Sequence, residues 1–135
     1  MTERVAKQSL TSGDHGTTYG GNPLACAAVC KVIELFEKQQ VLDNVRETGA
    51  YLSGKLDELV QEFSCIETRR GAGMLQGLVF DRPVGDIIVK AMDKGLVLIN
   101  AGTNIIRFVP SLVITKENVD EMTAVLRACI SEVCV

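Results

Sequence analysis

The sequence predicts an α+β fold in which a small antiparallel sheet is covered by helices on one face. Two patterns support this prediction. Some stretches place apolar residues three or four positions apart, as amphipathic helices do, and others alternate or run apolar for a few residues between glycines, as strands do. The 135 residues suffice for one domain with a buried core. The expected order is helix, helix, strand, strand, helix, strand, strand, helix.

The first two predicted helices follow each other closely. One begins at Asn22-Pro23, because asparagine can cap free N–H groups and proline has no N–H to satisfy at the first helical position. The second covers residues 41–63, where Val45, Leu52 and Leu56 lie on one stripe. Its interior glycines at 49 and 54 oppose a helix by about 1 kcal/mol each relative to alanine.

The rest of the chain predicts two hairpins and two further helices. Residues 66–69 alternate and residues 74–80 are apolar, so we expect two antiparallel strands joined through a bend at Gly71 and Gly73. Residues 84–92 form a short helical stripe that ends at Gly95. Residues 96–99 and 105–109 predict a second hairpin, and Thr115 predicts the cap of a final helix.

Composition excludes several classes of partner. The net charge is -3, and 47% of the residues are hydrophobic against 23% charged, which is close to the average soluble protein and gives no reason to expect binding to nucleic acid or to an anionic membrane. No apolar run is long enough to cross a bilayer, and the first ten residues are too polar for a signal peptide. We therefore expect a cytoplasmic location.

The five cysteines and the single histidine do not indicate a metal site. The cysteines lack zinc-type pairing, so we expect free and mostly buried thiols. His15 stands in a predicted loop without a cysteine or carboxylate cluster, and its imidazole is expected only to shape that loop.

The densest polar cluster is the segment HGTTYGGNP at residues 15–23. Two hydroxyls and several glycine amides stand just before a predicted helix N-terminus, an arrangement that suits an anion. Glycine- and threonine-rich segments of this kind are more often plain capping loops. No Gly-Lys-Ser/Thr follows, so the segment is not a P-loop.

This cluster resembles a block of the class-III, fold-type I pyridoxal 5'-phosphate (PLP) aminotransferases, written HG(S/T)T(F/Y)GGNPLA. The likeness continues in order through TRRGAGMLQGLVF, LVLINAG and IIRFVPSLVIT, and it covers nearly the whole chain. It implies that residues 23–135 form the C-terminal small domain of such an enzyme, and that residues 1–22 are the looped tail of its large PLP-binding domain.

The resemblance also implies roles for individual residues. Thr18 would reach across a homodimer interface to the PLP phosphate of the neighbouring subunit, and Thr17 would contact substrate. Arg107 would bind the substrate α-carboxylate with its planar fork. The residues alone leave two alternatives for Arg107, which lies in an apolar predicted strand. Its guanidinium either needs a carboxylate partner or faces solvent at a sheet edge. Arg70 matches a family position, where we expect it to orient the glycine bend rather than to touch substrate.

In the family, the lysine that carries PLP, the acid that holds its ring nitrogen and the aromatic that stacks on it all precede the HGTTYGG block. None of the seven lysines of this chain matches that lysine context. We therefore expect no catalytic residue in the chain and no activity from it alone.

The resemblance is strongest to the acetylornithine branch of the family. That branch moves the δ-amino group of N-acetylornithine to 2-oxoglutarate, giving glutamate, in arginine biosynthesis. Aminotransferases acting on ornithine, succinylornithine or 4-aminobutyrate remain alternatives, because the residues that choose among these substrates lie largely upstream. A non-catalytic ligand-binding or interaction module is an alternative of a different class.

Overall fold

The computed structural model describes residue 3 and residues 16–134. His15 and most of the loop predicted at residues 1–22 lie outside the described residues; residues 16–22 contain neither helix nor strand. The chain divides into two compact units, the first ending at Gln39 and the second beginning at Gln40. Each unit is described by itself.

The first unit contains helix α2, Pro23–Lys38. As predicted, Asn22 is its N-cap: the Asn22 side chain accepts a hydrogen bond of 3.0 Å from the backbone N–H of Ala25, and Pro23 occupies the first turn. No residue of α2 is buried, although Leu24, Val29 and Ile33 are large apolar side chains. The exposed surface of α2 therefore includes several large apolar side chains.

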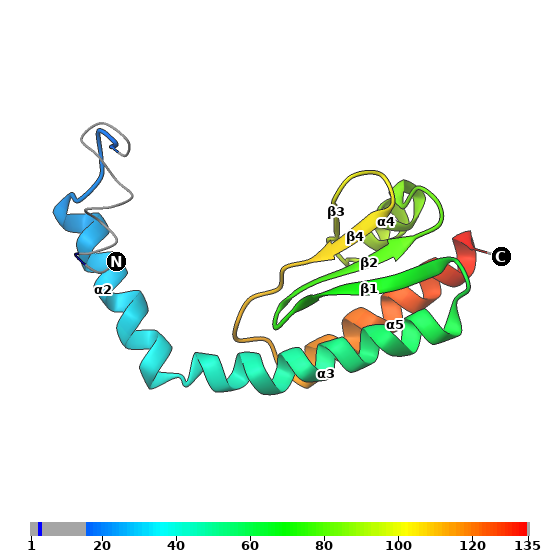
Figure 1. Ribbon diagram of the computed structural model, residues 1–135, viewed down its shortest axis with the longest axis horizontal. Coiled ribbons are helices and arrows are strands. Elements are labelled where there is room, and N and C mark those ends of the chain that lie inside the picture. The colour runs from blue at the N-terminus through cyan, green and yellow to red at the C-terminus, as the bar shows by residue number, and fades with distance from the viewer. Residues whose placement is uncertain (1–2, 4–15, 135) are drawn as a thin grey trace. The chain divides into compact units, whose positions relative to one another are not determined.

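The second unit is the predicted α+β layer. Its helices are α3 (Val41–Glu62), α4 (Gly85–Asp93) and α5 (Lys116–Val133), and its strands are β1 (Ile66–Ala72), β2 (Leu75–Phe80), β3 (Ile99–Asn100) and β4 (Ile105–Phe108). The strands form one antiparallel sheet in the order β1-β2-β4-β3, with α3 and α5 lying side by side beneath it (Figure 1).

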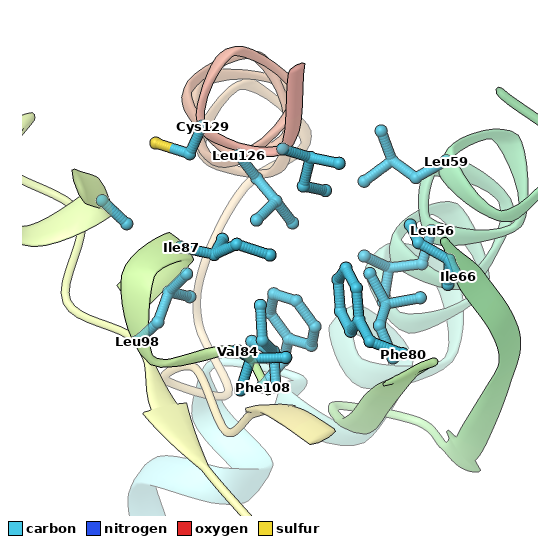
Figure 2. Packing of buried hydrophobic residues seen from close by; sticks show 14 of the residues in the cluster. Leu56, Leu59, Ile66, Phe80, Val84, Ile87, Leu98, Phe108, Leu126 and Cys129 are labelled. Carbon is cyan, nitrogen blue, oxygen red and sulfur yellow. The ribbon is translucent and has the colours of Figure 1, made fainter. Parts of the chain in front are cut away.

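The core lies between the sheet and the three helices of this unit. Phe80 and Phe108 project from the sheet toward Leu126 on α5 (Figure 2). Leu56 and Leu59 of α3 pack against the same cluster. These side chains are at most 5% exposed. Burying a large apolar side chain contributes roughly 1.5–3 kcal/mol, so this cluster is the main source of stability for the second unit.

Local signals set most element ends as predicted. Thr115 and Asn118 form a capping box at the start of α5, and Gly95 takes a positive φ of 83° just after α4. The predicted strand at residues 96–99 was mostly wrong, because β3 contains only Ile99 and Asn100. The N–H of Leu96 bonds to the Ala91 carbonyl at 2.8 Å, so the chain after Gly95 still closes the helix end.

The thiols are free, but not all are buried. Cys65 and Cys129 are buried, whereas Cys26 and Cys30 are exposed on α2. The expectation of mostly buried thiols was wrong for α2, because no residue of this helix is buried. Burial raises the pKa of the Cys65 thiol to about 12, with the neighbouring Cys134 adding to the effect, so this sulfur stays protonated and acts as an apolar group.

Two glycines in α3 make a matched pair for testing this packing. A Cβ on Gly49 would stand 3.0 Å from the Gly73 backbone, whereas a Cβ on Gly54 would meet nothing within 4 Å. Gly49→Ala should lower the free energy of unfolding by roughly 1–3 kcal/mol, because it forces the β1–β2 bend away from α3. Gly54→Ala should raise it by about 0.5–1 kcal/mol through helix propensity alone. Urea denaturation measures both, and equal effects from the two substitutions would contradict the close contact.

Asn22 allows a second test, in the first unit. Asn22→Ala should remove the cap and weaken the first turn of α2 by about 1 kcal/mol. Hydrogen exchange at the amide of Ala25 should then quicken roughly fivefold, while Asn22→Ser, which keeps a capping oxygen, should stay near wild type. Unchanged exchange in the alanine variant would show that the cap does not hold this helix end.

Candidate functional site

The first candidate site is the loop that enters α2. Thr17, Thr18 and Tyr19 are exposed, and Tyr19 reaches 81% exposure. The Asn22 side-chain amide donates to the Tyr19 carbonyl at 2.6 Å while its oxygen caps the helix. One side chain thus ties the threonine-bearing loop to the helix N-terminus.

The donor groups of this loop suit a phosphate. The hydroxyls of Thr17 and Thr18 make no hydrogen bond within the part of the chain that the structure describes. They precede a helix N-terminus, whose dipole favours an anion, although the N–H groups of Ala25 and Cys26 already bond to Asn22. The residues present therefore fit the phosphate end of PLP, the part of the cofactor that the resemblance assigns to Thr18.

The second candidate site surrounds Arg107 on β4. Arg107 is exposed, and in the sheet it stands opposite Gly77 of β2 on one side and Ile99 of β3 on the other. Arg107 is also among the residues that line a largely apolar cleft of about 380 Å³, which reaches under the sheet to Leu52 of α3 and to Met122 of α5. An exposed guanidinium can bind a carboxylate through two parallel hydrogen bonds.

The glycine bend between β1 and β2 is held by Arg69 and not by Arg70. Arg69 forms two hydrogen bonds with the Asp57 carboxylate on α3, at 2.7 and 3.1 Å, and donates a third to the Gln76 side chain at 3.0 Å. The amide of the buried Gln76 donates to the Gly73 carbonyl at 2.8 Å and to the Ser53 hydroxyl at 3.0 Å. The role that we expected for Arg70 in orienting the bend therefore falls to its neighbour.

Sequence reasoning missed this network and the position of Arg70. The alternation of a strand places Arg69 and Arg70 on opposite faces, which was a usable signal in the run TRRGAG. What the pattern lacked was the register, because a shift of one residue exchanges the two faces.

The described lysines mostly occupy surface ion pairs. These pairs are Lys31–Glu34, Lys55–Glu58, Lys116–Glu47, and both Lys90 and Lys94 with Glu132. The two lysines beside Glu132 hold its pKa down at about 2. Such lysines are charged and solvated, unlike a lysine prepared for nucleophilic chemistry.

The two candidate sites belong to different units. Thr17 and Thr18 stand in the first unit, and Arg107 stands in the second. Residues 16–134 contain no group of three or more metal-ligating side chains. Among the same residues, no helix has both the length and the apolar character needed to cross a membrane.

Known proteins similar to this chain are aminotransferases. A family model described as class-III aminotransferase matches residues 1–130. The chain is 47% identical over 116 residues to an acetylornithine aminotransferase of Gloeobacter violaceus, covering 84% of this chain and 29% of that protein. It is 42% identical over 125 residues to one of Aquifex aeolicus, covering 93% and 31%.

Solved structures agree with these relatives. An acetylornithine aminotransferase from Elizabethkingia anophelis is 25% identical with a TM-score of 0.81, covering 93% of this chain and 33% of that one. The ornithine delta-aminotransferase of Plasmodium falciparum is 31% identical with a TM-score of 0.82, covering 91% and 32%. The chain therefore spans about a third of the length of the proteins it matches. On the match over residues 1–130 and the shared fold, this chain belongs to the class-III aminotransferases.

Proposed function

We propose that the chain is the C-terminal portion of a PLP-dependent acetylornithine aminotransferase. The parent enzyme transfers the δ-amino group of N-acetylornithine to 2-oxoglutarate, which yields glutamate, as a step of arginine biosynthesis. The observation that carries this proposal is the identity of 35–47% to proteins named acetylornithine aminotransferase over most of the chain. The exposed guanidinium of Arg107 supports it, because each amino donor presents an α-carboxylate.

In the proposed enzyme, Arg107 binds the α-carboxylate of the amino acid. A guanidinium on a strand makes two parallel hydrogen bonds to one carboxylate and so orients the rest of the ligand. The neighbouring position in β2 is Gly77, which has no side chain to cover the guanidinium. Binding and orientation are the contributions of this residue.

Thr18 would donate a hydrogen bond to the phosphate of PLP in the neighbouring subunit, and Thr17 would contact the substrate beside it. When bound, PLP supplies the electron sink for amino-group transfer. The lysine that carries the cofactor would lie in the rest of the parent enzyme. The chain alone is therefore proposed to be inactive and to bind PLP weakly or not at all.

The parent is proposed to be a cytoplasmic homodimer. The free thiols fit a reducing compartment, and the division of roles between subunits at Thr18 requires a dimer. Within the chain, we propose that residues 1–22 end the large domain and residues 23–135 form the small domain.

Ornithine transamination is the second candidate, supported by the likeness to the Plasmodium falciparum enzyme named ornithine delta-aminotransferase. Succinylornithine and 4-aminobutyrate are further possible donors. Steady-state kinetics of the full-length enzyme with each donor distinguishes them. A specificity constant for ornithine above that for N-acetylornithine would favour the second candidate. A full-length protein with no transaminase activity would favour a non-catalytic ligand-binding or interaction module.

Arg107→Lys tests the carboxylate role in the full-length enzyme. Lysine keeps the charge but loses the fork, so the specificity constants for N-acetylornithine and glutamate should both fall tenfold to several hundred-fold, equivalent to about 1.5–3 kcal/mol. Arg127→Lys is the control, because Arg127 pairs with Glu62 on the surface and should tolerate the change. Wild-type constants for both donors in Arg107→Lys would remove Arg107 from the substrate site.

Thr18→Val tests the phosphate contact in the same enzyme. Loss of a hydrogen bond to a charged oxygen should raise the dissociation constant of PLP by about tenfold or more. Thr17→Val is the matched neighbour, and it should raise KM for the amino donor while leaving PLP binding near wild type. If the two variants retain PLP equally well, Thr18 has no special role toward the phosphate.

A further inference from the structure

Two cysteines, Cys65 and Cys134, meet at one end of the second unit. Cys65 stands between the end of α3 and the start of β1, and Cys134 is the C-cap of α5. Figure 1 shows the turn from α3 to β1 and the last turn of α5 at the same end of the sheet. An ion pair of 2.7 Å between Arg127 Nε and Glu62 Oε2 ties α5 to the last residue of α3 there.

The two thiols are neighbours in space. Cys65 is 3% exposed and belongs to the apolar core, and the half-buried Cys134 packs against the same core. Their side chains lie within hydrogen-bonding distance of each other, and both thiols are free. A disulfide requires that two cysteines approach closely, and here segments far apart in the chain bring them together. The pair therefore has the arrangement from which a cross-link can form.

A positive charge stands beside this pair. The Cys65 carbonyl accepts from the N–H of Asp81 at 3.0 Å, so the residues after β2 lie next to the start of β1. The Arg82 guanidinium interacts electrostatically with both sulfur atoms, and Asp81 holds it through hydrogen bonds of 2.7 and 3.3 Å. Thiol–disulfide exchange passes through thiolates, and a fixed guanidinium stabilises their charge. The carboxylate of Asp81 offsets part of this effect.

Cys129 provides a comparison on the same helix. It is also buried, but it precedes Cys134 by five positions, which turns its side chain about 140° around the helix axis. The groups that act on the Cys65 thiol include Cys134 and not Cys129. Those that act on the Cys129 thiol are Lys94, Glu132 and Lys90. Cys65 thus meets one of the two thiols that α5 and its cap provide.

We propose that Cys65 and Cys134 form a redox site, in which a low-molecular-weight disulfide such as oxidised glutathione converts the two thiols into one reversible disulfide. The Cys134 thiolate attacks one sulfur of the oxidant, so that a mixed disulfide forms and the first oxidant thiolate leaves and takes up the Cys134 proton. The Cys65 sulfur then attacks the Cys134 sulfur, and the second oxidant sulfur leaves with the Cys65 proton. Two protein thiols are oxidised, and the oxidant is reduced to two thiols.

The order of the two steps follows from exposure. Cys134 is open to solvent, so the oxidant reaches it first. Cys65 is buried, and its raised pKa keeps it protonated, so it reacts only when the mixed disulfide on Cys134 is held against it. This site lies apart from Thr18 and Arg107 and does not depend on the proposed transaminase activity.

The disulfide would cross-link the second unit. It joins the segment before β1 to the end of α5 and closes a loop that contains the whole sheet, α4 and α5. A cross-link over a long loop stabilises a fold mainly by restricting the unfolded chain. In a reducing compartment such a disulfide is transient, and it forms when disulfide oxidants accumulate. Oxidation therefore makes the second unit more stable, and reduction reverses the effect.

The test is oxidation of the folded 135-residue chain with glutathione mixtures of rising oxidised share, in a Cys26→Ser, Cys30→Ser background that removes the exposed thiols of α2. Cleavage after glutamate then separates the other three cysteines onto peptides 63–67, 122–132 and 133–135. Mass spectrometry without reductant should find peptide 63–67 linked to peptide 133–135. The linked chain should show a Tm roughly 10 °C or more above that of the reduced chain, and dithiothreitol should reverse the shift.

Three variants identify the role of each thiol. Cys129→Ala, the control, should form the same link. Cys65→Ala should stop at the mixed disulfide between glutathione and Cys134. Cys134→Ala should leave Cys65 unmodified and show no rise in Tm under the same oxidising mixture, because the oxidant does not reach the buried thiol.

The background chain alone can overturn the inference, so a variant that fails to fold does not protect it. The inference fails if glutathione stays on Cys134 without closing the link, or if excess oxidised glutathione modifies neither thiol. It also fails if the link involves peptide 122–132, or if it appears only after the chain has been unfolded in urea. None of these outcomes bears on the substrate roles proposed for Thr17 and Arg107.

Discussion

The contact between the β1–β2 bend and α3 is the constraint on which the second unit depends. Gly49 lets the backbone of Gly73 approach the helix closely, and Gln76 then hydrogen-bonds both to the bend and to Ser53. Arg69 adds a two-bond contact to Asp57 from the same face. Because these polar groups are partly or fully buried, leaving one of them unpaired would cost about 1–3 kcal/mol, so the bend has essentially one favourable position.

That position sets the register of the sheet. With Gln76 directed toward α3, alternation sends Gly77 to the face of the sheet opposite α3, here called the open face, and the pairing of β2 with β4 places Arg107 beside it. The core follows the same alternation, since Leu78 and Ile106 are paired neighbours directed into the apolar cluster. A slip of one residue would bury guanidinium groups and expose the core, so the packing and the candidate site depend on one arrangement.

The two units contribute different chemistry. The loop before α2 offers hydroxyls at a helix N-terminus, which suit a phosphate, and the open face of the sheet offers the guanidinium of Arg107, which suits a carboxylate. The chain spans about a third of the related aminotransferases, and no residue of α2 is buried.

Local interactions could be predicted from the sequence because they depend on residues a few positions apart. Asn22-Pro23, Thr115 and Gly95 marked helix ends correctly, and the spacing of Leu52 and Leu56 identified the buried face of α3. The motif around Thr17 and Thr18 indicated the family through residue types alone, because its residues are contiguous in the chain. The extent of β3 could not be predicted, because an apolar run does not determine where strand pairing begins.

The sequence by itself determined the α+β class and the order of helices and strands, since both follow from residue type and short-range periodicity, whereas the carboxylate role expected for Arg107 came from the family resemblance. Only the tertiary structure decided that Arg69 turns inward to Asp57 while Arg70 shares a row with Arg107. The reason is that cross-strand pairing joins residues far apart in the chain, and its register is set by packing of the bend against α3, which no local pattern encodes.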